Sequence, residues 1–283
     1  MVASPQNETA ATLNVARCKC SEAGPFVVML ANTTAVSQPS VGSVEASVAW
    51  STMFWTFVEA SQIAGGLVTI AGPQGHHLAR VLRVRPGEQG VAVASGREYR
   101  LEVIETAGNR VVGRIQGDRP VQGEARPAVT LLQAVLPNPD FDAVIESGTA
   151  VGIHRFIAVQ ADRSVPRPPA GRLARWQLIA GSAAEQSHRG RVPDVIGPTS
   201  LADALRQAGR ARLLLLEPSA QTPLRDALDG SPGYAIAVGP EGGWTERERS
   251  TIRGHGGVPV NLGPRILRAR LAPVVAAAIL VQP

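Results

Sequence analysis

The stretch YAIAVGPEGGWTERE, residues 234–248, contains the pattern that decides the fold. It opens with an apolar run of the kind found in parallel strands that are buried on both faces. A glycine-rich turn follows, and Thr245 and Glu248 then stand at the N-cap and capping-box positions of a helix start. A buried strand, a tight turn and a helix in immediate succession are typical of an α/β fold with a parallel sheet.

The same alternation continues on both sides of this stretch. Apolar runs at 129–136, 155–161 and 211–218 are predicted strands. Between and after them, helical patterns cover 141–152, 171–187, 200–209 and 266–280. These elements predict one α/β domain with a mostly parallel sheet over residues 128–283, and no internal repeat is visible.

The first half of the chain has a different pattern of hydrophobic residues. Short alternating segments at 67–72, 90–95, 97–105 and 110–116 predict strands separated by tight turns. Between the first two lies GHHLARVLRV, a predicted helix with Leu78, Val81 and Leu82 on one side and Arg80 and Arg83 on the other. We therefore expect a small β-domain at 53–118, with a barrel architecture, and a linker at 119–127.

Residues 1–52 differ in composition from the rest of the chain. They are rich in Ala, Ser, Thr and Val, contain the only lysine, Lys19, and show no sustained hydrophobic period. The segment fits a disordered tail, a targeting peptide, or upstream DNA translated from a start codon set too early. A secretory signal would need a basic region before its apolar stretch, and residues 1–52 contain none, which argues against that kind of targeting peptide. We favour the early start, with Met53 as the natural beginning.

Charge and cysteine content narrow the function classes. The net charge is +5, and all but one of the 28 basic residues are arginines, whose planar forks suit phosphate. No apolar run approaches the roughly 20 residues that span a bilayer, so a membrane protein is not expected. Cys18 and Cys20 form neither a disulfide framework nor a zinc site, which favours a reducing cytoplasm. The histidines and acids show no metal-ligand spacing.

Three loops follow the carboxyl ends of predicted strands, at 213–220, 237–243 and 260–268. Ligands of open α/β sheets bind at that edge, so the loops predict one shared pocket. The middle loop has neither a dinucleotide-binding fingerprint nor a Walker motif, and its Glu241 would repel phosphate. A cationic ligand suits it better, although a purely structural glycine turn is an equal reading of this loop alone.

Two windows carry clusters of basic residues. His76, His77, Arg80 and Arg83 have no acid among them, and the window 163–191 contains six arginines. A solvated helix face explains such clusters as readily as RNA binding does, and His77 alone fits a packed core residue. Next to a pocket for RNA chemistry, the RNA interpretation is preferred, because arginine contacts to phosphate supply much of RNA affinity.

Five stretches together resemble one family. They are GHHLARVLRVRPGE, RWQLIAGSAAEQSHRGRVP, LLLLEPSA, YAIAVGPEGGWTERE and LGPRILR. In this order and spacing they resemble the bacterial 16S ribosomal RNA uridine N3-methyltransferase family of the SPOUT superfamily, over roughly residues 53–283. MFWTFV at 53–58 is similar to the amino-terminal opening of that family.

The resemblance implies a fold, a cofactor and partners. We expect a PUA-like RNA-binding β-domain followed by an α/β methyltransferase domain that ends in a trefoil knot. We also expect S-adenosylmethionine at the knot, a homodimer, 16S rRNA of the small ribosomal subunit as substrate, and a cytoplasmic location. The implied reaction is methylation of uridine N3, which needs alignment and departure of the imide proton but no protein nucleophile.

Site residues follow from matching the family motifs position by position. The implied cofactor residues are Leu216, Glu217, Gly239, Pro240, Glu241, Gly242, Leu262, Gly263, Ile266, Leu267 and Arg268. Arg268 and Glu241 are the catalytic candidates, the arginine for charge that develops on the uracil oxygens. The RNA-binding candidates are His76, His77, Arg80, Arg83, Gln186 and Arg189, of which Gln186 and Arg189 are also candidates for orienting the substrate. Spacing alone assigns no general base.

The sequence departs from the family pattern in three places. Ala269, Arg270, Leu271 and Ala272 replace the usual Thr-Glu-Thr-Ala after ILR, Asn138 replaces a lysine, and Ala150 replaces the glutamate of Glu-Leu-Gly. Three hypotheses are therefore open. The chain is an active uridine N3-methyltransferase, a catalytically impaired homologue that binds RNA, or a relative that methylates another RNA or a ribose 2′-oxygen.

Overall fold

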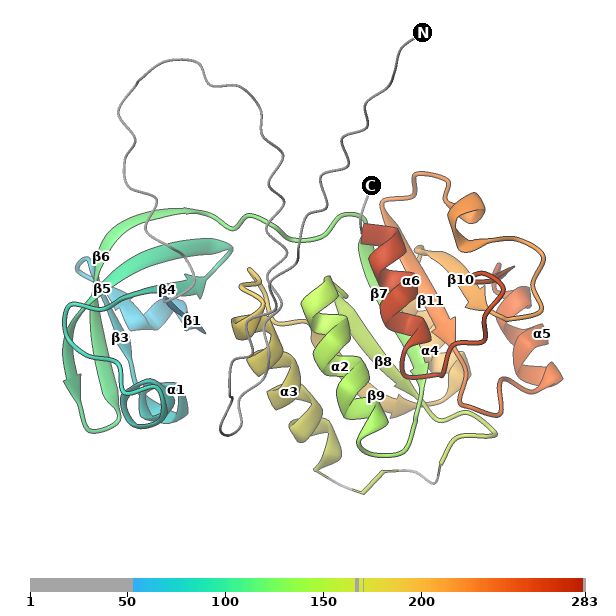
Figure 1. Cartoon of the computed structure of the whole chain (residues 1–283), viewed down its shortest axis with the longest axis horizontal. Coiled ribbons are helices and arrows are strands. Elements are labelled where there is room, and N and C mark those ends of the chain that lie inside the picture. Colours follow the sequence, from blue (N-terminus) through green and yellow to red (C-terminus); the bar gives the residue numbers. More distant parts are fainter. Residues whose placement is uncertain (1–52, 166–167, 170, 282–283) are drawn as a thin grey trace, which may run out of the picture. The chain divides into compact units, whose positions relative to one another are not determined.

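Two six-stranded sheets form the framework of the chain (Figure 1). The computed structural model describes residues 53–165, 168, 169 and 171–281, so the prediction made for 1–52 lies outside the described residues. Within the described part, no helix is both long and apolar enough to cross a membrane.

The first sheet has the strand order β1-β4-β5-β6-β3-β2. Its strands are β1 (Phe54–Phe57), β2 (Ile63–Ala64), β3 (Leu67–Ile70), β4 (Gln89–Ala94), β5 (Arg97–Ala107) and β6 (Arg110–Pro120), with a short 3-10 turn η2 (Ala60–Gln62) before β2. β1 is parallel to β4, and the other pairs are antiparallel. The four predicted strands are present, and β6 continues through Pro120 into the predicted linker.

The helical segment between β3 and β4 starts earlier than predicted. α1 (Gly72–His76) has Pro73 in its first turn, a position where proline is favoured. It continues as a π-helical turn, η3 (His77–Val81). Leu78 is buried as expected, but Val81 and Leu82 are 61% and 52% exposed. A π turn contains more residues per turn than an α-helix, so the last two apolar residues are rotated away from the core.

The second sheet has the order β12-β10-β11-β7-β8-β9, and all its pairs are parallel. Its strands are β7 (Ala128–Ala134), β8 (Arg155–Val159), β9 (Asp194–Thr199), β10 (Arg212–Leu216), β11 (Gly233–Val238) and β12 (Val258–Val260). The sequence did not predict β9, because Gly197 and Pro198 interrupt it. Proline in a sheet is tolerated at an edge, and β9 is an edge strand.

Helices cover both faces of this sheet (Figure 1). The core under α2 (Asp140–Val151), α3 (Arg172–Gln186) and α6 (Ala272–Val281) contains Phe141 and Trp176, whose ring centroids are 4.3 Å apart. The core under α4 (Leu201–Ala208) and α5 (Glu246–Gly254) contains Trp244. A short 3-10 turn, η4 (Leu224–Ala227), follows β10. The predicted α/β domain is thus a parallel sheet between two helical layers.

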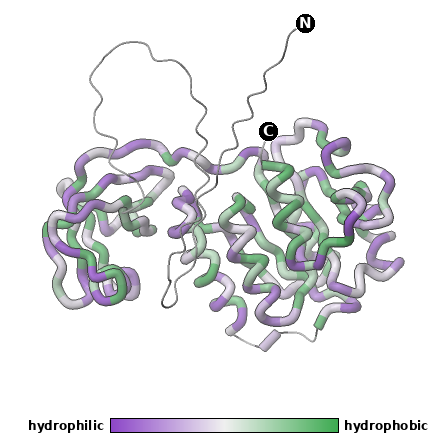
Figure 2. Tube along the Cα trace, viewed as in Figure 1, coloured by the Kyte–Doolittle hydropathy of each residue, from purple (hydrophilic) through white to green (hydrophobic). Residues whose placement is uncertain are grey.

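The last helix is shorter than predicted. α6 begins at Ala272, with Pro273 in its first turn, and is hydrophobic along its length (Figure 2). Residues 266–271, predicted as helix, instead form a loop in which Leu271 N–H and Ala272 N–H both donate to Arg268 O. The difference matters because this loop lines the pocket described next.

Candidate functional site

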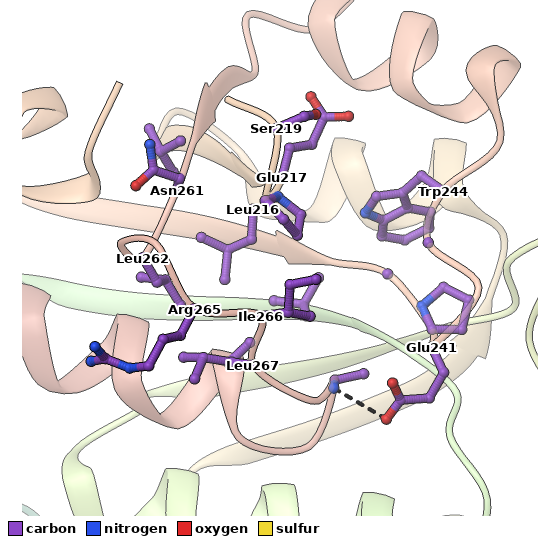
Figure 3. Close-up of a pocket in the computed structure, with 18 of the residues that line it drawn as sticks. Leu216, Glu217, Ser219, Glu241, Trp244, Asn261, Leu262, Arg265, Ile266 and Leu267 are labelled. Carbon is purple, nitrogen blue, oxygen red and sulfur yellow. Dashed lines mark hydrogen bonds between the residues drawn. The ribbon is translucent and has the colours of Figure 1, made fainter. Parts of the chain in front are cut away.

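Three loops at the carboxyl ends of β10, β11 and β12 enclose a pocket of about 210 Å³ (Figure 3). Parallel strands end at the same edge of a sheet, which brings together loops distant in sequence. Trp244 and Glu241 lie on one side of the pocket, and Leu262 and Leu267 lie on the other. The predicted shared pocket is present.

The glycine loop after β11 is compact because its own main chain folds back on itself. A Cβ on Gly239 would lie 3.1 Å from Trp244 N, and Gly243 has a φ of +67°. Both positions therefore favour glycine for reasons internal to the loop. At Gly242 neither reason applies, since a Cβ would make ordinary contact with Arg163.

Glu241 connects two walls of the pocket. Its Oε1 accepts a hydrogen bond from Ala269 N–H at 3.2 Å, which joins the glycine loop to the loop before α6 (Figure 3). The carboxylate thus borders a cavity with largely apolar walls. Such a group stabilises a positively charged ligand and disfavours an anionic one.

Glu217 provides a second carboxylate, held by two arginines of α5. Arg249 Nε lies 3.4 Å from its Oε1, and Arg253 Nη2 lies 3.1 Å from its Oε2. The side chain is almost fully buried, and its main-chain N–H donates to Val260 O at 2.9 Å. Because both oxygens are engaged, Glu217 fixes the loop after β10 against α5 and β12.

Asn261 organises the third loop. Its Nδ2 donates to Ala220 O at 2.8 Å, and its Oδ1 accepts from Gly263 N–H at 2.9 Å. Gly263 has a φ of +100°, which a side chain would strain. The asparagine therefore links the loop after β12 to the loop after β10.

The start of α5 is braced by the loop after β8. Thr245 and Glu248 form the predicted capping box, which is confirmed. Glu248 Oε1 also accepts from Asp162 N–H at 2.8 Å, and Arg163 Nη1 donates to Gly242 O at 2.7 Å. Hydrogen bonding to Arg247 and Thr245 lowers the pKa of the Asp162 carboxyl. The glycine loop is therefore held from outside the pocket as well as from within.

Nine of the eleven predicted cofactor residues line the pocket. They are Leu216, Glu217, Gly239, Pro240, Glu241, Leu262, Gly263, Ile266 and Leu267. Gly242 and Arg268 are not among the lining residues, and the side chain of Arg268 is exposed. The sequence did not single out Trp244, Arg249, Asn261 and Arg265, which also line the pocket, although each lies in or beside a quoted motif. The buried Trp244 Nε1 has no hydrogen-bond partner among the described residues.

The predicted RNA-binding residues divide into two groups. His76, His77, Arg80 and Arg83 are exposed on α1 and η3 and the residues that follow, which removes the alternative that His77 is a core residue. Gln186 is exposed at the end of α3. That end lies just before β9 starts, at the edge opposite the pocket, so Gln186 and Arg189 do not orient a substrate in the pocket of the same chain.

Arg189 is not an exposed RNA contact, because it is only 6% exposed and its guanidinium binds groups of the protein. Its guanidinium binds Glu124 at 2.6 Å and donates to Ile153 O at 2.6 Å and Thr149 O at 3.2 Å. Burial alone would raise the pKa of Glu124, but hydrogen bonding and the charge of Arg189 outweigh it and lower that pKa. Burial and Arg189 likewise lower the pKa of His154. We assign Arg189 a structural role between the linker and α2.

β1 is attached to the end of α3 by several polar contacts. Trp55 Nε1 donates to Arg189 O at 2.9 Å, and Thr56 Oγ1 donates to Glu185 Oε1 at 3.0 Å. Burial raises the pKa of Glu185, although the hydrogen bonds that it accepts from Thr56 Oγ1 and Phe57 N–H partly oppose this. The indole of Trp55 also stacks on His188. Contacts between residues so distant in the chain leave no local signal in the sequence.

Comparison with known proteins adds independent information. A family model described as an RNA methyltransferase domain matches residues 124–281, and one described as an RNA methyltransferase PUA domain matches residues 70–116. The chain is 35% identical over 231 residues to ribosomal RNA small subunit methyltransferase E of Mycobacterium bovis, covering 78% of this chain and 88% of that protein. The Bacillus subtilis protein of the same name is 30% identical, covering 74% and 87%.

A solved structure is similar over nearly the same extent. It is the ribosomal RNA small subunit methyltransferase E from Neisseria gonorrhoeae bound to S-adenosyl methionine, with a TM-score of 0.74 and 30% identity. The match covers 80% of this chain and 95% of that one.

Proposed function

Since the chain belongs to the RNA methyltransferase family of ribosomal RNA small subunit methyltransferase E, we propose that it methylates N3 of a uridine in 16S rRNA, with S-adenosylmethionine as methyl donor. The observation that carries the proposal is the pocket at the carboxyl edge of the second sheet, which the exposed Glu241 lines together with largely apolar residues.

The residues present fit this cofactor. Its sulfonium is a cation, which the carboxylate of Glu241 would stabilise, and its apolar parts would suit Leu216, Leu262 and Leu267. The unpartnered Nε1 of Trp244 is a spare donor in the pocket wall. We further propose that main-chain groups of the three loops hold the adenine and ribose.

When bound, S-adenosylmethionine supplies a methyl group already activated on sulfur. The protein would therefore have to align the uridine and stabilise charge as N3 gives up its proton, with no side chain assigned as the base, and bonds to the methyl carbon. The bond from that carbon to sulfur would break in the same step, and S-adenosylhomocysteine would leave with a neutral sulfur. We assign Arg268 to the uracil oxygens, where that charge develops, because its side chain is exposed on the loop that lines the pocket. Glu241 is assigned to the cofactor side of the reaction.

Two of the departures from the family pattern, Ala269 and Arg270, are compatible with activity. Ala269 keeps the main-chain N–H that Glu241 binds, so its lost hydroxyl does not remove this contact. Arg270, which stands where the family has a carboxylate, donates to Asp140 Oδ1 at 3.0 Å and so ties the loop to the start of α2. An impaired, RNA-binding homologue is the second candidate, favoured by Asn138 and Ala150, for which no replacement contact compensates among the described residues.

Three further expectations are carried into the proposal. We propose that residues near the carboxyl terminus are threaded as a trefoil knot, that two copies form a homodimer, and that the enzyme acts in the cytoplasm on the small ribosomal subunit. The support for the dimer is α6, whose Val274 and Val275 are partly exposed although the helix is hydrophobic throughout.

Transfer of labelled methyl groups tests the reaction. We expect the full chain to methylate small ribosomal subunits that lack the modification, and mass spectrometry of the digested RNA to find N3-methyluridine. Calorimetry with S-adenosylmethionine separates the candidates: cofactor binding without transfer favours the impaired homologue, and a methylated ribose 2′-oxygen favours the third hypothesis.

A further inference from the structure

His188 has an unusual main-chain conformation at the end of α3. Its φ is 53°, in the left-handed region where helices usually end with glycine or asparagine. Its N–H donates to Glu185 O at 3.2 Å, and Arg189 N–H donates to Ala184 O at 2.9 Å, so the turn is fixed on both sides. A residue held in a strained main-chain conformation is a reason to look for a function.

The imidazole of His188 is also fixed in orientation. It stacks on Trp55, with ring centroids 4.9 Å apart and an angle of 11° between the planes. Trp55 is buried and donates to Arg189 O, so the surface beneath His188 is rigid. Burial lowers the pKa of His188, which favours the neutral ring. His188 is nevertheless an exposed residue, and so it presents an aromatic face.

This face borders a cleft that is separate from the cofactor pocket. The cleft has a volume of about 760 Å³, and its lining includes His188, Trp55, His77, Gln74 and Gln186. The two glutamines are exposed amides, which offer both donors and acceptors to a base edge. Exposed Arg80 and Arg83 lie on and just after η3, close in sequence to the lining residues His77 and Leu82, and the carboxylate of Glu185 also lines the cleft. Aromatic stacking beside basic groups is the chemistry that binds single-stranded nucleic acid.

The cleft cannot hold the base that reacts in the same chain. His188 precedes β9 and lies at the amino-terminal edge of the second sheet, whereas the cofactor pocket lies at the carboxyl edge. The neighbouring strand β8 has 5 residues, which corresponds to roughly 16 Å between the two edges. A base at His188 is therefore a nucleotide other than the one that this chain methylates.

We propose that His188 is a stacking platform for one unpaired nucleobase of the bound RNA, and that it anchors a nucleotide separate from the methylated uridine. The inference rests on the proposed function, because it takes RNA as the ligand. It predicts that removal of one particular base weakens binding when His188 is present and has little effect when its ring is absent.

A double-mutant cycle tests this coupling. The probe is a fluorescein-labelled 16S rRNA fragment containing the methylated uridine, together with versions that carry an abasic nucleotide at each position in turn. In the full chain, His188→Asn removes the ring and retains a residue that tolerates positive φ. We expect it to raise the Kd by roughly 5- to 150-fold, the range for one stacked base. At one abasic position, the wild type should bind the abasic RNA more weakly than the intact RNA by the same factor. His188→Asn should bind the two RNAs equally well.

Two controls make the result specific. His255→Asn is the matched substitution, since His255 is an exposed histidine at the end of α5, outside the cleft, and its Kd should be unchanged. His188→Phe keeps a ring and should restore most of the binding. The dependence of Kd on salt should be the same in His188→Asn as in the wild type, because no phosphate contact is lost.

Other outcomes overturn the proposal. Equal Kd values for wild type and His188→Asn, or losses that add at every abasic position, exclude the stack, and the proposed function stands if the wild type still methylates small subunits. A wild type that neither binds this RNA nor methylates small subunits excludes both. Near-ultraviolet circular dichroism of each variant checks that the fold is retained.

Discussion

At the scale of single residues, the charge of Glu241 can be separated from its hydrogen bond. Glu241→Gln retains an oxygen that can accept from Ala269 N–H but loses the negative charge. We expect S-adenosylmethionine to bind about tenfold more weakly, a loss of about 1.4 kcal/mol, because the sulfonium loses its counter-charge. Isothermal calorimetry measures this directly.

The reaction product provides the control for that measurement. S-adenosylhomocysteine has a neutral sulfur, so its affinity should change less than that of the donor. A loss of the same size for both ligands would mean that Glu241 acts through loop structure rather than through charge.

Glu185 allows a prediction about stability and pH. Burial raises its pKa, so the folded chain holds this proton more tightly than the unfolded chain does, and stability falls as pH rises through the folded value. Glu185→Gln imitates the protonated form and keeps an acceptor for Thr56 Oγ1. At pH 7 we expect a gain of about 1 kcal/mol after solvent screening, or about 2–4 °C in Tm. The gain should shrink at acidic pH, and a Tm difference independent of pH would contradict it.

For Arg189 we predict the opposite effects of substitution and of pH on stability. Arg189→Met leaves Glu124 partly buried without its partner, and we expect a loss of about 3 kcal/mol in urea unfolding. The pKa of Glu124 is lowered in the fold, so the stabilisation is present above the ordinary value of 4.5 and lost as pH falls through the folded value. Adding Glu124→Gln should recover part of the loss. No recovery would mean that Arg189 acts through its bonds to main-chain carbonyls.

At the scale of elements, the pair Arg270 and Asp140 connects the loop before α6 to the start of α2. The pair is exposed, so it contributes little to global stability. Arg270→Glu places two carboxylates together, and we expect the KM for S-adenosylmethionine to rise a few-fold with little change in Tm. The charge swap Arg270→Glu with Asp140→Arg should restore the KM. A swap as impaired as the single variant would show that the ion pair is not the relevant contact.

Elements with a strong periodic signal were predictable, and the exceptions have local causes. The apolar runs of β7, β8, β10 and β11 and the patterns of α2, α3 and α4 gave the parallel fold. β9 was missed because its glycine and proline conceal an edge strand, and the start of α6 was misplaced because hydrophobicity continues across a loop. Periodicity reports burial, and burial alone does not distinguish a packed loop from a helix.

The part of the candidate site that the main-chain loops at the strand ends form was predictable from the sequence. The three loops do meet, because parallel strands share a carboxyl edge. Arg189 was misread, since the sequence does not show whether an arginine faces water or a buried glutamate. The contact of Trp55 with His188 was also beyond the sequence, because it joins two segments that have no local pattern in common.

At the scale of the whole molecule, the proposed homodimer makes a prediction about mass. The chain has a mass of 29.6 kDa, and light scattering should give about twice that value. If the partly exposed face of α6 is the contact, Val274→Glu should yield a monomer, because a buried unpaired charge is unfavourable. A control substitution on the exposed side of α5, Ser250→Glu, should leave the dimer intact. A wild-type mass of one chain would exclude the dimer.

The strand order of the second sheet has a consequence for synthesis on the ribosome. β7 is the first of its strands to be made, and it lies between β8, which follows soon after, and β11, which is made much later. One edge of β7 therefore stays unpaired while the intervening chain is translated, and an unpaired apolar edge is a template for aggregation. From the order in which the chain emerges, we therefore expect the nascent protein to be prone to aggregation until β11 is complete.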